Sequence, residues 1–138
     1  MKKLMYNTIV IEGIDKTGKD LLGKYLFELD KGKYLHISRG ILSCIAYNKL
    51  YNRLYEYDLE SHQKEVYIYL NINKEDWNIR CKITNEPKIN YEQNVEAFEY
   101  AKNIIKQYCI VLECNVSDES VYNLATKIID MMDELNRR

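Results

Sequence analysis

The sequence predicts an α/β fold in which about four parallel strands form a short sheet with helices on both of its faces. Three observations support this prediction. Short apolar runs recur along the 138 residues, segments with apolar residues at helical spacing separate these runs, and a glycine-rich turn follows the first run. Strands that alternate with helices require right-handed crossovers and a parallel sheet. We expect the strands to lie in the order second, first, third, fourth.

The first two strands flank a helix. Residues 6–12 read Tyr-Asn-Thr-Ile-Val-Ile-Glu, and a continuous run of this kind is typical of a strand that is buried on both faces. Apolar residues at helical spacing then predict a helix that ends at Gly32. Residues 33–38 are expected to return as the second strand. We expect that strand to be buried, with His36 as a core histidine rather than a catalytic base.

The later segments repeat the alternation. Asn73 and the acidic residues after it are typical of a helix start, and the only proline, Pro87, should end that helix. The segment 74–91 is charged and has little apolar periodicity, so we interpret it as a candidate mobile lid. The remaining expected elements are a helix over 41–57, a strand over 66–72, a helix over 91–107, a strand over 108–114 and an amphipathic helix over 121–135.

Composition indicates one soluble globular domain over residues 1–138. The chain is 46% apolar and 30% charged, and its net charge of −1 argues against sequence-independent binding to nucleic acid or to an anionic membrane. No run approaches the length of a membrane span. The four cysteines form no C-x-x-C pair, which argues against a zinc site, and without a signal peptide they predict a reducing, cytoplasmic setting.

The glycine-rich turn carries the chemistry. Residues 13–19 read Gly-Ile-Asp-Lys-Thr-Gly-Lys and match G-x-x-x-x-G-K, between a predicted strand and a predicted helix. Glycines let successive N–H groups point at an anion, the helix adds its positive end, and the lysine adds a full charge. This motif predicts a P-loop NTPase fold. The residues expected to bind the phosphates of a nucleotide are Gly13, Ile14, Asp15, Lys16, Thr17, Gly18, Lys19 and Asp20.

Residues 11–19, Ile-Glu-Gly-Ile-Asp-Lys-Thr-Gly-Lys, resemble the E-G-x-D-x-x-G-K opening of thymidylate kinases and related deoxynucleoside and deoxynucleotide kinases. Residues 38–43, Ser-Arg-Gly-Ile-Leu-Ser, look like the D-R-G/D-R-Y block of those enzymes, and residues 77–82, Trp-Asn-Ile-Arg-Cys-Lys, resemble their basic lid. The resemblance implies phosphoryl transfer from ATP, with Mg²⁺, to a deoxynucleoside monophosphate such as dTMP or to a deoxynucleoside.

The resemblance also implies roles for single residues. Lys19 would hold the donor phosphates, Arg39 would meet the phosphate of the acceptor, and Arg80 would close over the transferring group. Asp15 would contact the acceptor. Such kinases are commonly homodimers that pack through a helix of the type expected over 41–57. A compact kinase from an AT-rich genome, as the many tyrosines suggest, is expected of a phage or prophage.

Two positions depart from the family pattern. The P-loop hydroxyl that binds Mg²⁺ is replaced by Asp20, and the acid of the second block is replaced by Ser38. Our hypothesis is an exchange, in which Asp20 and Ser38 together hold the metal directly or through water. In the competing interpretation Asp20 repels phosphate and the protein is a nucleotide-binding regulatory or interaction module without turnover. A carboxylate in the first turn of a helix is also favourable in itself.

The chain is shorter than the family it resembles. Additional elements usually lie between the P-loop helix and the second block, so the part that often encloses the acceptor base is reduced here. For several further residues, the sequence allows two interpretations of their role. Tyr47, Tyr51 and Tyr55 indicate packing more than base stacking, Arg80 and Lys82 fit either a lid or a solvated helix, and Glu12 is either an acid of the site or a structural group. Glu86 is a second candidate acid, and residues 115–117 are candidate contacts of the nucleotide base.

Overall fold

The computed structural model describes residues 4–84 and 90–137 of the chain. Within them, one sheet contains four parallel strands in the order β2-β1-β3-β4. The expected α/β class and the expected strand order are therefore confirmed. The strands are β1 (Thr8–Glu12), β2 (Leu35–Ser38), β3 (Glu65–Asn71) and β4 (Ile110–Asn115).

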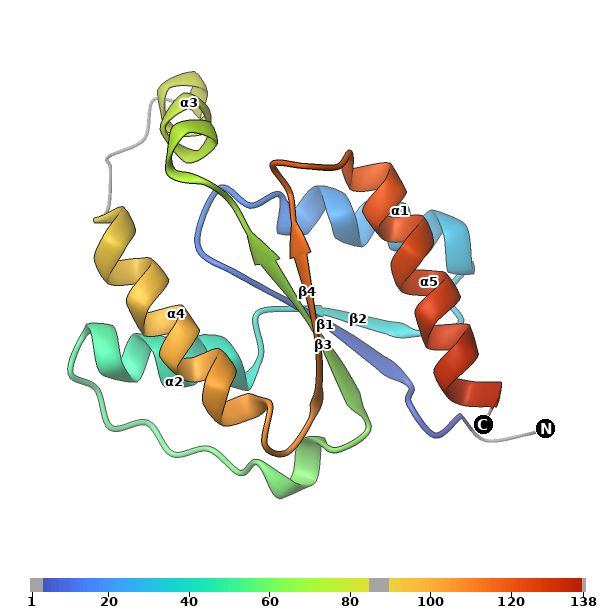
Figure 1. The fold of residues 1–138 in the computed structure, drawn as a ribbon. Coiled ribbons are helices and arrows are strands. Elements are labelled where there is room, and N and C mark those ends of the chain that lie inside the picture. The colour runs from blue at the N-terminus through green and yellow to red at the C-terminus, as the bar shows by residue number, and fades with distance from the viewer. Residues whose placement is uncertain (1–3, 85–89, 138) are drawn as a thin grey trace.

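Helices cover both faces of the sheet, as the alternating pattern predicts (Figure 1). Helices α1 and α5 pack together on one face, and α2 and α4 pack together on the other. Helix α3 lies beyond the carboxyl ends of β3 and β4, and a short 3-10 helix, η1 (Glu60–His62), precedes β3. The α-helices are α1 (Lys19–Asp30), α2 (Ile41–Leu50), α3 (Lys74–Thr84), α4 (Tyr91–Ile105) and α5 (Val121–Arg137).

The two central strands form the middle of the core. Every residue of β1 is buried, and so are the five inner residues of β3. Because helices lie on both faces, these strands can bury side chains in both directions, which explains their continuous apolar runs. Tyr67 and Phe98 are among the largest side chains that are fully buried. This core fixes the carboxyl ends of β1 and β3, and the phosphate-loop motif directly follows β1.

Strand β2 differs from the prediction. It lies at the edge of the sheet, and none of the described residues forms a strand along its outer side. Leu35 is 66% exposed and Ile37 is 39% exposed, so the expectation of a buried strand over 33–38 is wrong. His36 is partly buried, and its Nε2 lies 2.7 Å from the Asp30 carboxylate, which satisfies the ring as expected of a structural histidine.

The helix expected over 41–57 ends at Leu50. Asn52 takes a left-handed conformation (φ 54°), and the Asn48 side chain bonds to both backbone polar groups of Tyr55. The chain therefore leaves the helix before Tyr55, which does not share a helical face with Tyr47 and Tyr51. Tyr47 packs edge-on against Phe98 (5.5 Å between ring centroids) and stacks on Tyr51 (5.7 Å), as expected for packing.

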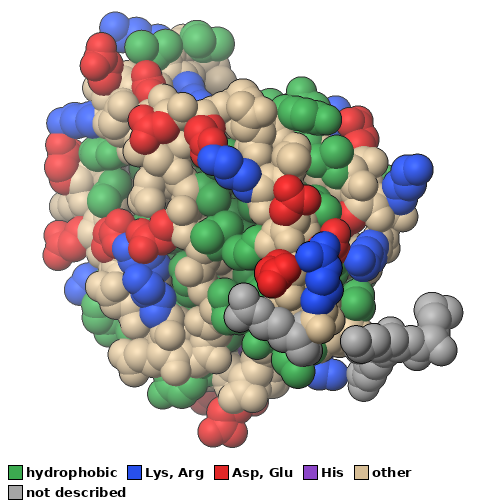
Figure 2. Space-filling view, turned by 45° about the vertical axis from the view of Figure 1, so that its right-hand side comes forward, with side chains coloured by type: hydrophobic (Ala, Val, Ile, Leu, Met, Phe, Trp, Pro, Cys, Tyr) green, Lys and Arg blue, Asp and Glu red, His purple; other side chains and the backbone are tan. Residues whose placement is uncertain are grey.

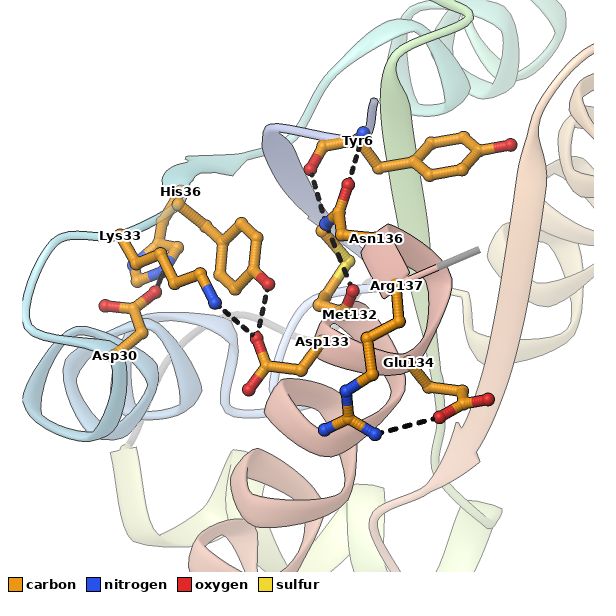
Figure 3. A network of polar contacts seen from close by, with 10 residues as sticks. Tyr6, Asp30, Lys33, His36, Met132, Asp133, Glu134, Asn136 and Arg137 are labelled. Atoms are coloured by element: carbon orange, nitrogen blue, oxygen red, sulfur yellow. Dashed lines mark hydrogen bonds and ion pairs between the residues drawn. The ribbon is translucent and has the colours of Figure 1, made fainter. Parts of the chain in front are cut away.

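The last turns of α5 hold two other parts of the chain in place (Figure 3). Asn136 accepts a hydrogen bond from the Tyr6 N–H and donates one to the Tyr6 carbonyl, both at 2.9 Å. Asp133 accepts hydrogen bonds from Lys33 (2.9 Å) and from the Tyr34 hydroxyl (2.5 Å). The helix thus fixes the segment before β1 and the segment before β2 at the same end of the sheet.

The helices, the surface charges and the candidate lid can be compared with the expectations from the sequence. No helix in the described part of the chain is both long and apolar enough to span a membrane. On the face drawn in Figure 2, basic and acidic side chains are interspersed, as the near-zero net charge suggests. Of the candidate lid over 74–91, residues 74–84 form α3, whereas residues 85–89, which include Glu86, lie outside the described residues.

Candidate functional site

The loop between β1 and α1 has the backbone conformation that the phosphate-loop motif requires. Gly13 (φ 145°), Lys16 (φ 71°) and Gly18 (φ 86°) all have positive φ, so the chain reverses direction tightly before the helix. A Cβ atom on Gly13 would lie 2.8 Å from the Leu70 carbonyl oxygen, so this position also requires glycine for space. Gly18 is the N-cap of α1, which places the positive end of that helix at the loop.

Lys19 lies inside this loop. Its Nζ donates to the carbonyl oxygens of Gly13 (2.9 Å) and Ile14 (2.7 Å) and contacts the Thr17 hydroxyl at 3.2 Å. Burial, followed by the nearby Arg39 guanidinium, lowers the pKa of Lys19 to about 8. The ammonium group therefore lacks a fully compensating negative charge, and an incoming anion would supply one.

A cavity of about 370 Å³ opens beside the loop. It brings together most of the residues that the sequence selects, from the loop, the first turn of α1 and the end of β2. Gly13, Ile14 and Thr17 do not line this cavity; Ile14 and Thr17 are buried, and the Thr17 hydroxyl donates to the Ile14 carbonyl. The residues that line it are Asp15, Lys16, Gly18, Lys19, Asp20, Leu21, Ser38 and Arg39.

Arg39 crosses the cavity from the end of β2. Its guanidinium pairs with the Asp15 carboxylate and donates to the Tyr47 hydroxyl at 2.6 Å, while lying over the Tyr47 ring. Its backbone is left-handed (φ 69°), a conformation that costs an arginine on the order of 1 kcal/mol or more. The sequence reasoning missed Tyr47 as a partner of Arg39, because nothing in helical spacing shows which tyrosine faces the site.

Helix α3 contacts the loop on its backbone. Arg80 donates to the Lys16 carbonyl at 2.7 Å, and the Trp77 indole N–H donates to the Asp15 carbonyl at 3.2 Å. Arg80 is not among the described residues that line the phosphate cavity. In this structure it supports the loop. Trp77 lies in the segment that resembles a basic lid, and its position beside the loop makes the single tryptophan of the chain a natural reporter of the site.

Glu12 is a structural group. Its carboxylate is completely buried and accepts hydrogen bonds from the N–H groups of Gly40 (2.9 Å) and Ser43 (3.0 Å) and from the Ser43 hydroxyl. It therefore caps the N-terminus of α2. Burial raises the pKa of Glu12, and these hydrogen bonds oppose that rise. Of the two interpretations left open for Glu12, this geometry supports the structural one.

The donors present fit a magnesium ion. Asp20 and Ser38 come from different elements and line the same cavity beside Lys19, and carboxylate and hydroxyl oxygens are hard ligands of the kind that Mg²⁺ prefers. Magnesium at phosphate sites commonly keeps several waters and takes only one or two protein ligands. Among residues 4–84 and 90–137, no group of three or more histidine, cysteine or acidic side chains could hold a metal ion, so the protein would supply only the two ligands Asp20 and Ser38.

Comparison with known proteins supports the fold. No protein-family model matches the chain, and no curated protein sequence matches it. Among solved structures, the YorR protein from Bacillus subtilis, crystallised in complex with phosphorylated GDP, is similar with a TM-score of 0.78. The similarity covers 96% of this chain and 99% of YorR, with 14% sequence identity. The chain therefore shares, over nearly its whole length, the α/β fold of a protein that was solved with a phosphorylated nucleotide bound.

Proposed function

We propose that this protein is a kinase that transfers the γ-phosphoryl group of ATP, with Mg²⁺, to a deoxynucleoside monophosphate such as dTMP or to a deoxynucleoside. One observation carries the proposal: a single cavity unites the loop lysine Lys19, the oxygen donors Asp20 and Ser38, and the arginine Arg39. Each kind of group has a use in phosphoryl transfer, which depends mainly on positioning and on placed charge. The phosphorylated nucleotide in YorR supports a nucleotide as the ligand.

The donor and the acceptor meet at Lys19 and Arg39. Lys19 and the loop amides hold the β- and γ-phosphates, and Arg39 exchanges its pairing with Asp15 for the phosphate of the acceptor. An acceptor oxygen attacks the γ-phosphorus. The new O–P bond forms while the bond from this phosphorus to the bridging oxygen breaks, and ADP leaves with that electron pair. A monophosphate oxygen is already anionic, so this step needs no general base, which favours a monophosphate over a deoxynucleoside.

Asp20 and Ser38 would hold magnesium, which supplies positive charge to the phosphate oxygens when bound. This exchange predicts that the double variant Asp20→Ser with Ser38→Asp keeps most of the transfer activity, because one carboxylate and one hydroxyl remain at the site. Each single variant should lose more activity than the double variant does, since it leaves two hydroxyls or two carboxylates. The measurement is kcat against magnesium concentration, with circular dichroism as the control for folding. A folded double variant that is less active than both singles contradicts the exchange.

Arg80 and Asp15 have second roles in this proposal. Arg80 leaves the Lys16 carbonyl and turns toward the γ-phosphate when nucleotide binds, and Asp15, freed from Arg39, contacts the acceptor. The homodimer that the resemblance implies stays a prediction, and light scattering of the purified protein tests it.

The alternative is a nucleotide-binding module without turnover. Two observations favour it: Asp20 adds a negative charge to a cavity meant for phosphates, and Arg80 is bonded to the loop backbone outside that cavity. Slow ATP hydrolysis would not separate the two functions, because both kinds of protein show it.

A panel of deoxynucleoside monophosphates and deoxynucleosides, assayed with ATP and Mg²⁺, tests the proposal. Transfer to any acceptor supports the kinase, whereas ATP binding without transfer to any acceptor supports the module. Trp77 fluorescence measures ATP binding separately, because the indole contacts the loop.

Lys19→Met should abolish both transfer and ATP binding. Lys127→Met, which removes an exposed lysine of α5 paired with Glu119, is the matched control and should leave both unchanged.

A further inference from the structure

A second cavity continues from the phosphate cavity along the edge of the sheet. Its volume is about 480 Å³, and it lies between α1 and β2. The two cavities share Lys19, Asp20 and Ser38, so they form one cleft with the phosphate loop at one end. We call the second part the α1–β2 groove; it is lined by Ile11, Lys19, Asp20, Gly23, Lys24, Phe27, Glu28, His36, Ile37 and Ser38.

Much of the surface inside this groove is apolar, although the groove is open to solvent. Phe27 of α1 is 61% exposed and Ile37 of β2 is 39% exposed. Gly23 has no side chain, and Ile11 lies beneath it, which leaves room between the helix and the strand. The Phe27 ring is held edge-on to the His36 ring, with 6.4 Å between centroids, and His36 is in turn bonded to Asp30. The groove therefore offers an exposed aromatic ring beside an anchored imidazole.

The strand order gives this groove a direction relative to the donor. β2 and β4 are the two edges of the sheet, and the phosphate loop follows β1 between them. Residues 115–117, the candidate contacts of the donor base, lie at the end of β4, so a donor whose base binds there would direct its terminal phosphate toward the β2 side. Asp20 and Ser38, the proposed magnesium ligands, stand on that side. The space beyond them is the α1–β2 groove, where an acceptor would present its oxygen to the γ-phosphorus.

We propose that the α1–β2 groove binds the base and the sugar of the phosphate acceptor, a deoxynucleoside monophosphate. This inference rests on the proposed function. The apolar walls cover the faces of the base, with Phe27 as the stacking partner, and the acceptor phosphate extends past Ser38 to Arg39 in the phosphate cavity. The groove thereby replaces the acceptor region that is reduced in this short chain.

The polar residues of the groove indicate broad selectivity among bases. Lys24 and Glu28 lie one helical turn apart on α1, and both line the groove. Every nucleobase carries both a donor and an acceptor on its edge, so one cation and one carboxylate can serve any of them. Because both side chains are also exposed to water, they add little discrimination. We expect the four common deoxynucleoside monophosphates to bind within about tenfold of one another.

The test is calorimetric titration of dTMP and, separately, of ATP into the whole protein and its Phe27→Ala variant. Base–aromatic stacking contributes about 1–3 kcal/mol per base, so the Kd of dTMP should rise roughly 5- to 150-fold. The Kd of ATP should stay within about twofold. Phe27→Trp should restore dTMP binding, because it returns an aromatic face. Tyr108→Ala, which removes an aromatic residue of similar exposure before β4, is the matched control and should change neither value.

Each other outcome is decisive. Equal weakening of ATP and dTMP would assign the groove to the donor base and overturn the inference. An unchanged Kd for dTMP overturns it too, and light scattering then shows whether Phe27 instead lies at an interface between two copies of the chain. Failure of the proposed function would give a different set of results. If no acceptor is phosphorylated but dTMP binding still depends on Phe27, the groove stands and the kinase does not. If transfer occurs but Phe27→Ala leaves the KM of the acceptor unchanged, the kinase function is supported and the role of the groove is overturned.

Discussion

In the proposed function, Lys19 connects phosphate binding to pH. Its ammonium group is buried and held by loop carbonyls, and burial lowers its pKa to about 8. The charged form is complete below this pKa and is lost as pH rises through it. A bound polyphosphate stabilises the charged form, so the pKa of Lys19 rises again in the complex. We therefore expect ATP affinity to fall between pH 7 and pH 9, and binding at pH 8 to take up a fraction of a proton.

Calorimetry measures this proton uptake directly. Titrations of ATP at pH 8 in two buffers with different ionisation enthalpies should give different apparent binding enthalpies, and the difference gives the number of protons taken up. Lys127→Met is the control and should show the same uptake as the unchanged protein. Equal enthalpies in both buffers, together with a flat affinity from pH 7 to pH 9, would show that Lys19 does not titrate on binding.

In the proposed function, Arg39 is positioned for its ligand at some cost to the free protein. It keeps a left-handed backbone at the end of β2, and its guanidinium is paired with Asp15 across the cavity. Both features persist because the surroundings fix them: the Arg39 N–H donates to the Ile11 carbonyl at 2.9 Å, and the Tyr47 hydroxyl holds the guanidinium. Strain of this kind is concentrated at functional sites. In the proposed function, the phosphate of the acceptor replaces the Asp15 carboxylate as the partner of Arg39.

At the scale of elements, replacing two different glycines by alanine should change the free energy of unfolding in opposite directions. A Cβ on Gly40, just before α2, would lie 2.8 Å from Val10 Cγ1 and 3.3 Å from the Tyr67 hydroxyl oxygen. Gly40→Ala should therefore push α2 away from β1 and lower the free energy of unfolding by about 1–3 kcal/mol. A Cβ on Gly23 would meet only Ile11 Cδ1, at 3.8 Å. Gly23→Ala should instead stabilise α1 by about 0.5–1 kcal/mol.

Urea unfolding of both variants measures this contrast, and each variant serves as the control for the other. Because Gly23 also lines the α1–β2 groove, Gly23→Ala should weaken dTMP binding while it stabilises the fold. A Gly40→Ala variant as stable as the unchanged protein would mean that α2 can shift without cost. In that case its packing against β1 does not fix the position of Arg39.

The order and type of the elements could be predicted from the sequence because they depend on local periodicity. Buried β1 and β3 have the continuous apolar runs that a central strand requires, and α5 has a strong apolar stripe. The burial of β2 was predicted wrongly, although residues 35–38 (Leu-His-Ile-Ser) lack the continuous apolar run of β1 and the expected strand order already placed this strand at an edge of the sheet. The end of α2 depends on side-chain bonds from Asn48 to Tyr55, which no periodicity records.

The candidate site was predictable to the extent that it is contiguous in sequence. The loop residues and the following Asp20 come from one motif. Ser38 ends β2 and Arg39 follows it, and parallel pairing brings the end of this strand to the same edge as the loop. The contacts of Trp77 with the loop and of Tyr47 with Arg39 depend on how α3 and α2 pack. The groove beside α1 depends on an exposed strand edge. These features arise from tertiary packing, so the sequence alone did not show them.

At the scale of the whole molecule, α5 joins the two ends of the described chain. Asn136 satisfies both backbone polar groups of Tyr6, and Asp133 binds Lys33 and Tyr34 in the segment before β2 (Figure 3). These contacts lie far from the phosphate loop and touch no residue of either cavity. They should therefore govern stability without governing binding.

Asn136→Ala should lower the free energy of unfolding by about 1–3 kcal/mol, because it leaves the Tyr6 N–H and carbonyl without their partner. Urea unfolding at neutral pH measures this change.

Asp133 makes the stability of the protein depend on pH. Hydrogen bonds from Tyr34 and then Lys33 hold the pKa of Asp133 below its usual value, so its stabilisation is present above the unfolded pKa and lost as pH falls through the folded one. Unfolding measured from pH 7 down to pH 2 should show less acid destabilisation in Asp133→Asn than in the unchanged protein. If either variant changed the affinity for ATP, the contacts of Asn136 and Asp133 would not be independent of the candidate site.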